Sequence, residues 1–329
     1  MSTLPTVSVI MATFRRASEL PAAVLSLLAD PAASEVVVAV DGCLDGSIEV
    51  LEKLAADDPR LKPLWIEHAG KQGAAAAALA AASGDVVLLM DDDMIAAPGL
   101  AAGHARHHAA REDLVVLGYS PTSVPARRAR GNIPVFLYAR DYDNHCDELE
   151  ADDGLVLREL HGCNVSLRRA DCERIGLYAP EFPNAYHEDQ EFGLRCLRAG
   201  MVGVFDRSLR AEHRYTRSVE GFLRDARSQG AGSVMVHLLH SELTGPFDPR
   251  CIERGLALPL ALVVRSARLP WVARTVGGAL RPVIWLAGWL RAFGLESGAI
   301  RLARRVEQRY GAELATRRRF SVRAGAPPA

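Results

Sequence analysis

Three consecutive carboxylates, Asp91, Asp92 and Asp93, follow directly on an apolar run at residues 86–90. Such a run, bounded by Gly84 and by charge, is typical of a strand buried on both faces. Adjacent carboxylates repel one another and are costly to remove from water, but a divalent cation among them makes the arrangement favourable. Ligands of open α/β sheets bind beyond the carboxyl ends of the strands. The triplet therefore indicates a Mg²⁺ or Mn²⁺ site, and the alternative is a solvated acidic loop.

Alternating strand and helix patterns predict how this triplet is positioned. The expected strands are residues 7–11, 36–40, 64–66, 86–90, 114–117 and 202–205. The expected helices are residues 17–28, 48–54, 73–82, 98–108 and 189–198. Such alternation predicts an α/β fold with a mostly parallel sheet and right-handed crossovers. Between about residues 121 and 154 the periodicity fades, which predicts an irregular loop, either functional or disordered.

The composition is that of an ordinary globular protein, with 329 residues, 49% hydrophobic and 24% charged. The net charge of −1 is uneven, because residues 251–329 hold 14 arginines, no lysine and four glutamates. The six cysteines form no CxxC pair, which predicts reduced thiols rather than disulfides or a zinc site. We see no signal-peptide pattern and no uncharged apolar stretch of membrane-spanning length, so we expect a cytoplasmic protein.

Five motifs, in chain order, resemble those of the family 2 glycosyltransferases, which have the GT-A fold. The family's VSVIIPTYNR, VVDDGSxDGS, LDxDD, GGNxxxRR and EDxDLxLRLxxAG are similar to residues 7–16, 38–47, 90–93, 162–169 and 188–200. The resemblance covers about residues 6–215. Two residues depart from the first motif, since Ala12 replaces its proline and Arg15 its asparagine.

This resemblance implies a fold and a reaction. The fold would be a GT-A-type, Rossmann-like, mostly parallel sheet flanked by helices. The reaction would be an inverting transfer from a nucleotide-diphosphosugar, expected to be a UDP-sugar, to an acceptor that the motifs do not specify. The leaving nucleoside diphosphate carries charge that a divalent cation, Mg²⁺ or Mn²⁺, neutralises.

Donor-binding roles follow from the same resemblance. Ala12, Thr13 and Phe14 are expected beside the nucleobase and Asp41 at its polar edge, while Lys71 would approach the nucleotide. For Thr13 and Phe14 the alternative role is packing.

The resemblance also assigns the metal ligands. Asp93 is the expected ligand, with Asp91 on the ribose or on a metal-bound water. Asp92 either contributes to the donor site or is solvated. His213 follows the last expected strand, where related enzymes often have a metal-binding histidine, and the alternative is a structural histidine.

An inverting transfer needs a base that deprotonates the acceptor as it attacks. Asp189 matches the family's usual base, and Glu188 beside it is the rival. The alternative for both is favourable charge at a helix N-terminus. His161 would line the acceptor pocket.

We expect a catalytic domain at residues 1–250, with a nucleotide-sugar half at about 1–118 and an acceptor half at about 119–250. A helical, basic extension follows at 251–329. Its apolar segments, with arginines beside them, hold three of the four tryptophans. This pattern favours peripheral contact with the inner face of the membrane, and the alternatives are packing on the catalytic domain or a homo-oligomer.

Other functional classes fit less well. A nucleotidyltransferase-like enzyme would have a glycine-rich loop after the first strand, but residues 11–16 contain no glycine. A catalytically silent binding partner would not need the acidic triplet and the pair at residues 188–189. Nucleic acid is not an expected partner, because the basic charge lies outside the sheet domain and has little aromatic interleaving.

Overall fold

The computed structural model describes residues 4–179, 182 and 186–323 and divides into two compact units. Unit 1 comprises Met1–Ser123, Tyr142–Ala179 and Phe192–Tyr215. Unit 2 comprises Val124–Asp141, Pro180–Glu191 and Thr216–Ala329. These units are defined by compactness, and their limits differ from the expected boundary at residue 250. The expected division into a catalytic domain and a C-terminal extension stays a prediction.

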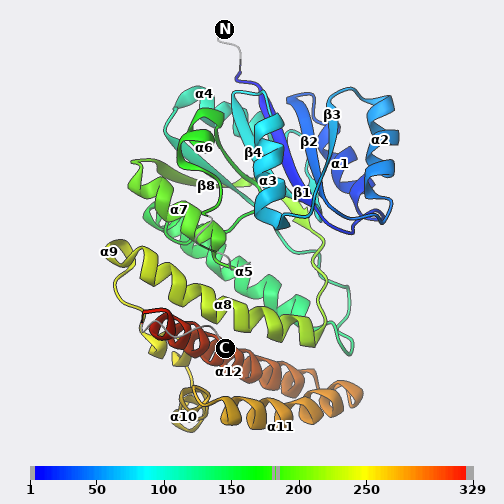
Figure 1. Cartoon of the computed structure of the whole chain (residues 1–329). Helices are drawn as coiled ribbons and strands as arrows, with labels where there is room; N and C mark the ends of the chain where they lie inside the picture. Colours follow the sequence, from blue (N-terminus) through cyan, green and yellow to red (C-terminus); the bar gives the residue numbers. More distant parts are fainter. Residues whose placement is uncertain (1–3, 180–181, 183–185, 324–329) are drawn as a thin grey trace. The chain divides into compact units, whose positions relative to one another are not determined.

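A mixed sheet forms the centre of unit 1 (Figure 1). Its strands, among the described residues, follow the order β3-β2-β1-β4-β7-β6-β8-β5. The strands are β1 (Val7–Thr13), β2 (Ala33–Asp41), β3 (Leu61–Ile66), β4 (Val86–Asp91), β5 (Met94–Ala96), β6 (Leu114–Tyr119), β7 (Val165–Arg168) and β8 (Val202–His213). The first four strands are parallel, as are β6 and β8, whereas β7 is antiparallel to β4 and β6 and β5 is antiparallel to β8. The predicted α/β fold is confirmed.

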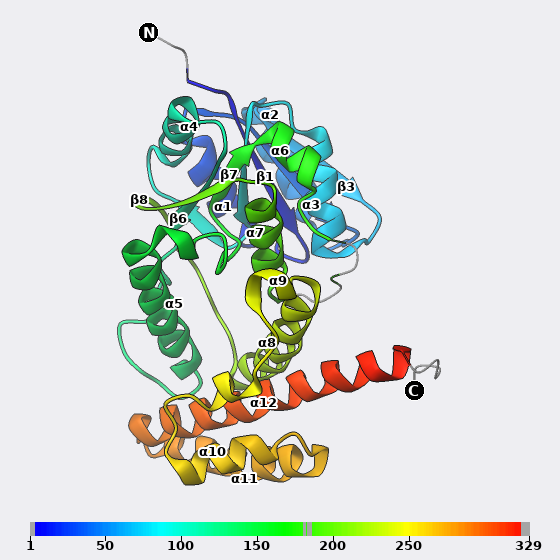
Figure 2. The ribbon, with the colours of Figure 1, turned by 90° about the vertical axis from the view of Figure 1, so that its left-hand side faces the viewer.

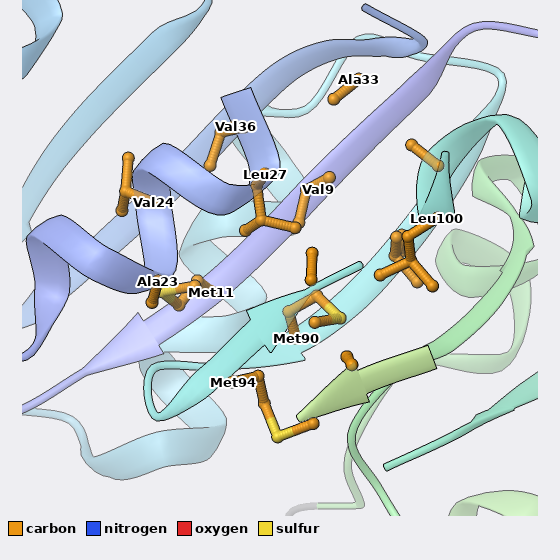
Figure 3. Packing of buried hydrophobic residues seen from close by; sticks show 14 of the residues in the cluster. Val9, Met11, Ala23, Val24, Leu27, Ala33, Val36, Met90, Met94 and Leu100 are labelled. Carbon is orange, nitrogen blue, oxygen red and sulfur yellow. The ribbon is translucent and has the colours of Figure 1, made fainter. Parts of the chain in front are cut away.

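Both faces of this sheet are buried, so successive strand residues enter different cores. Val9 and Met11 of β1 pack with Leu27 in one cluster, as Figure 3 shows, whereas Ile10 packs with Ala78 in the other. The first core is covered by α1 (Leu20–Leu28), α2 (Ser47–Asp57) and α4 (Leu100–Ala110). The second is covered by α3 (Gly70–Ala81), α6 (Arg169–Ile175) and part of α7 (Glu188–Arg198). Double burial explains the unbroken apolar runs in the sequence.

The expected irregular loop at residues 121–154 is wrong for most of its length. It contains α5 (Ile133–Ala151), followed by the short 3₁₀ helix η1 (Asp153–Leu155). Ile133, Leu137, Cys146 and Leu149 are buried at helical spacing. The many charged residues between them hid this periodicity in the sequence.

Unit 2 is helical, as predicted for the C-terminal part. It contains α8 (Val219–Leu239), α9 (Ser241–Thr244), η2 (Pro249–Glu253), α10 (Leu258–Ser266), α11 (Pro270–Trp289) and α12 (Phe293–Arg323). Helix α12 packs against both α8 and α11 (Figure 2). A Cβ at Gly230 would lie 2.0 Å from the carbonyl oxygen of Gln308, and one at Gly311 1.9 Å from that of Arg227, so these glycines let α8 and α12 meet closely. In the described part of the chain, no helix combines the length and the apolarity needed to cross a membrane.

Candidate functional site

The three aspartates lie where β4 turns tightly into β5, and we call Asp91–Asp93 the acid turn. Asp91 is the last residue of β4, and Asp92 and Asp93 form the turn itself. Met90 and Met94, on either side of it, are buried in the first core (Figure 3). Two apolar anchors therefore hold the backbone that carries the carboxylates. The short β5 was missed by the sequence analysis.

Strand β8 brings His213 to the acid turn. Met94 and His213 are register partners of β5 and β8, and His213 Nε2 lies 3.3 Å from Oδ1 of Asp93. Arg16 Nη2 lies 3.3 Å from the other oxygen, Oδ2. Burial acts to raise the pKa of Asp93, but the hydrogen bond from His213 and the nearby positive charges bring this pKa below its usual value. Asp93 is therefore an ionised carboxylate beside an imidazole.

Asp92 is not solvated, so that expectation is wrong. Thr13 Oγ1 donates a hydrogen bond of 2.7 Å to its Oδ2, Arg16 Nε lies 3.7 Å from its Oδ1, and its side chain is only 14% exposed. Burial raises the pKa of Asp92 to about 6, against the effects of Thr13 and Arg16. Thr13 is itself buried, and its hydroxyl fixes the orientation of Asp92.

Three other expected donor residues surround the same strand ends. Ala12 is the register partner of Asp91 in the parallel pair of β1 and β4. Lys71, in the first turn of α3, places Nζ 3.3 Å from Oδ1 of Asp91. Phe14 is 43% exposed, and its ring centroid lies 5.3 Å from that of His68. An exposed aromatic face beyond a strand end is suited to stacking on a nucleobase.

Asp41 ends β2 and is almost fully buried. Its Oδ1 accepts hydrogen bonds from the backbone N–H groups of Ala69 at 2.6 Å and Gly70 at 3.1 Å, and its Oδ2 lies 2.9 Å from His68 Nδ1. These contacts hold the loop that leads into α3. Its role at the nucleobase stays a prediction.

Sequence reasoning missed Arg16 and His68, which contact the predicted carboxylates. A signal for Arg16 was available: residues that follow β1 lie beside those that follow β4, because parallel neighbours end at the same edge of a sheet. A cation just beyond β1 therefore lies near the acid turn. His68 gave no comparable signal, since its position depends on the loop before α3.

The second acidic group, Glu188 and Asp189, begins α7 and belongs to unit 2. Glu188 is buried, whereas Asp189 is partly exposed. His187 before them has a left-handed φ of 69°. Its Nδ1 lies 2.9 Å from Gln190 Oε1 and its Nε2 3.2 Å from Ser233 Oγ, so the start of the helix is fixed from both sides. The acid turn and this pair belong to different units.

The sequence profile described as "Glycosyl transferase family 2" matches residues 8–176, just over half of the chain. The chain belongs to glycosyltransferase family 2. A similar solved structure is that of the mannosyltransferase PcManGT from Pyrobaculum calidifontis, in complex with GDP-Man and Mn2+. The TM-score is 0.57 at 19% sequence identity, over 92% of this chain and 86% of that chain. This likeness confirms the GT-A-type fold. No curated protein sequence matches the chain.

In this glycosyltransferase, Asn164 of the fourth motif, residues 162–169, is held by a buried network of hydrogen bonds. Asn164 has a left-handed φ of 59°, and its Nδ2 donates to the carbonyl oxygen of Leu209 at 2.8 Å. Its Oδ1 lies 2.9 Å from His104 Nε2. Ser166 Oγ lies 2.7 Å from His104 Nδ1 and 2.8 Å from His108 Nε2. This network of hydrogen bonds therefore joins α4, β7 and β8.

The direction of each hydrogen bond in this network follows from the side-chain amide of Asn164. Because Oδ1 of Asn164 can only accept, Nε2–H of His104 donates to it, and Nδ1 of His104 must accept from the Ser166 hydroxyl. The Ser166 oxygen in turn accepts from Nε2–H of His108. Both imidazoles are neutral in this scheme, and burial accordingly lowers the pKa of His104 to about 4 and that of His108 to about 3.

His161, the expected acceptor-pocket residue, lies in an aromatic cluster. Its ring centroid is 5.0 Å from that of Tyr142 and 5.1 Å from that of His145. Burial lowers the pKa of His161 to about 3, and within the described residues neither ring nitrogen has a hydrogen-bond partner. Contact with an acceptor stays a prediction.

Proposed function

We propose that this family 2 glycosyltransferase transfers a sugar from a nucleotide-diphosphosugar to an acceptor with inversion, using a divalent cation at the acid turn. The observation that carries the proposal is the 3.3 Å contact between Asp93 and His213 at the carboxyl end of β4. The family supplies the reaction class. The acid turn supplies the charge that a diphosphate and its cation require.

Asp93 and His213 are the residues that would hold the cation. Mg²⁺ usually takes one or two protein carboxylates and completes its coordination with substrate phosphates and water, and imidazole also suits transition metals. Over the described residues, no group of three or more His, Cys, Asp or Glu side chains could hold a metal alone. Two protein ligands fit a site that the donor completes. The cation would offset the charge of the leaving nucleoside diphosphate.

The other residues of the acid turn orient the donor. Thr13 fixes Asp92 through its hydroxyl, and Lys71 neutralises Asp91 at 3.3 Å. Lys71 is partly exposed, so its ammonium can also contact a phosphate oxygen. Phe14 offers its exposed ring to the base. Together these side chains would hold the diphosphate and the nucleoside in one orientation.

Asp189 is the proposed base. It is the more exposed of the two carboxylates at the start of α7, whereas Glu188 is buried. A base must reach the hydroxyl or amine whose proton it removes, so exposure favours Asp189. The motif that begins at residue 188 supports the same choice.

The donor nucleotide is tested with a panel of UDP- and GDP-sugars. The family resemblance favours a UDP-sugar as the donor. The similar mannosyltransferase binds GDP-Man, so a GDP-sugar is the alternative donor. We expect at least one nucleotide sugar to raise the melting temperature and to be slowly hydrolysed with Mn²⁺ but not with EDTA. A panel in which no nucleotide sugar does either would refute the proposal.

A further inference from the structure

Helices α10 and α11 of unit 2 expose large apolar side chains to solvent. In α10 only Val264 is fully buried, whereas Leu258 and Leu262 are exposed. In α11 the side chains of Trp271, Trp285 and Trp289 are 60–66% exposed. Scattered exposed apolar residues are normal in soluble proteins, but two consecutive helices that each expose several large apolar side chains indicate an interaction surface.

The three tryptophans share one side of α11. At 100° per residue, positions 271, 285 and 289 fall within roughly 40° of one another around the helix. Ala273 and Ile284, which are buried against the rest of unit 2, fall on the opposite side. The tryptophans therefore point away from the side by which α11 packs within its own unit.

Positive charge flanks this apolar face. Residues 254–295 contain six arginines, no lysine and no acidic residue. All six arginines are exposed, and of these only Arg265 is paired with a carboxylate, that of Glu253 at 2.6 Å, among the described residues. Arg274 and Arg281 of α11 lie on the flank of the tryptophan side, by the same helical geometry.

We infer that α10 and α11 form a docking surface for an anionic lipid bilayer. Tryptophan prefers the interface between headgroups and acyl chains, and arginine extends its guanidinium to the headgroup phosphates. A second copy of this chain fits less well, because it would bring another six arginines, of which only Arg265 is paired, against the first six. Negatively charged lipid complements both the apolar face and its charged flank. Such docking requires neither donor nor cation, so it stands apart from the proposed reaction.

Sedimentation of the full chain with vesicles tests this inference. We expect binding to vesicles that contain about a third phosphatidylglycerol, no binding to pure phosphatidylcholine, and weaker binding at high salt. The tryptophan emission should shift to shorter wavelength on binding. A protein that stays in the supernatant with anionic vesicles at low salt overturns the inference.

Two variants locate the surface. Arg274→Glu with Arg281→Glu should weaken vesicle binding at least about tenfold. The matched control, Arg106→Glu with Arg224→Glu, changes exposed arginines of α4 and α8 and should leave binding unchanged. Equal losses in both variants overturn the assignment to α11.

Apolar contact is tested separately. Trp285→Ser with Trp289→Ser should also weaken binding, whereas Trp65→Ser, at an exposed tryptophan of β3, should not. All four side chains that the two α11 variants change are exposed, so melting temperatures should stay near that of the native chain. If Trp285→Ser with Trp289→Ser instead abolishes a dimer and leaves vesicle binding intact, the surface belongs to a second copy.

Discussion

The molecule carries two acidic groups that are built in different ways. The acid turn ends a strand buried on both faces, and each of its carboxylates contacts a basic or hydroxyl side chain, of Lys71, Thr13, Arg16 or His213. Glu188 and Asp189 instead begin a helix, where the helix dipole favours negative charge.

The two acidic groups are suited to two different chemical roles. Carboxylates held rigidly among cationic side chains are suited to a fixed cation and its diphosphate, because their orientation changes little when the ligand binds. A partly exposed carboxylate at a helix start is suited to reaching an acceptor and taking its proton. This difference supports the proposal that the acid turn binds the donor and that Asp189 acts on the acceptor.

The largest effect is expected for Asp93→Asn, which should abolish transfer and leave the fold intact. The amide is a poorer ligand for a hard cation, and it removes the negative charge that His213 and Arg16 contact. Release of nucleoside diphosphate measures the loss. Asp57→Asn, at an exposed position at the end of α2, is the matched control. Activity within about tenfold of the native chain would remove Asp93 from the mechanism.

Asp189→Asn should lower turnover by about two orders of magnitude or more, as expected for the loss of a general base. Donor affinity should barely change, because this carboxylate is assigned to the acceptor. Single-turnover rates and donor titration together distinguish the two effects. If Glu188→Gln is inactive and Asp189→Asn is nearly normal, the base is Glu188.

Arg16→Gln should have a smaller effect that depends on the cation. The variant loses the positive charge beside Asp92 and Asp93. Arg16 is itself 34% exposed and its contacts are 3.3–3.7 Å long, so they contribute about 1 kcal/mol at most. In EDTA, the melting temperature of the variant should be about 2 °C lower than that of the native chain. Addition of Mn²⁺ should raise the melting temperature more in the variant than in the native chain. Equal Mn²⁺-induced rises in the variant and in an Arg106→Gln control would show that Arg16 does not offset this charge.

A further effect is expected on stability at mild acid pH. Because burial depresses the pKa of His104 and His108 below 6.5, the unfolded chain binds more protons than the folded one between about pH 6.5 and pH 4. Stability should therefore fall as pH falls through this range, by about 2 kcal/mol per histidine at pH 5. Urea unfolding at pH 7.5 and pH 5 measures the slope. His108→Gln keeps an N–H donor but does not titrate, so its slope should be shallower; an unchanged slope contradicts the neutral hydrogen-bond network.

Local patterns predicted the three carboxylates and the central strands that position them, because residues 36–40 and 86–90 are unbroken apolar runs that end at Asp41 and Asp91. The three residues of β5 were too few to show a period, and the charges of α5 hid its buried stripe. The contact between His104 and Asn164 joins residues 60 apart in the chain. No sequence window contains such a pair, and Arg16 likewise gains its role only when β1 and β4 lie side by side.

The central claim is that the acid turn is a cation-dependent nucleotide site. Isothermal titration of UDP and of GDP, each with and without Mn²⁺, tests it in the native chain and in Asp93→Asn. The account predicts that one nucleotide binds the native chain only with Mn²⁺ and that this binding is lost in Asp93→Asn. Unchanged affinity in Asp93→Asn, or equal affinity without Mn²⁺, would contradict it.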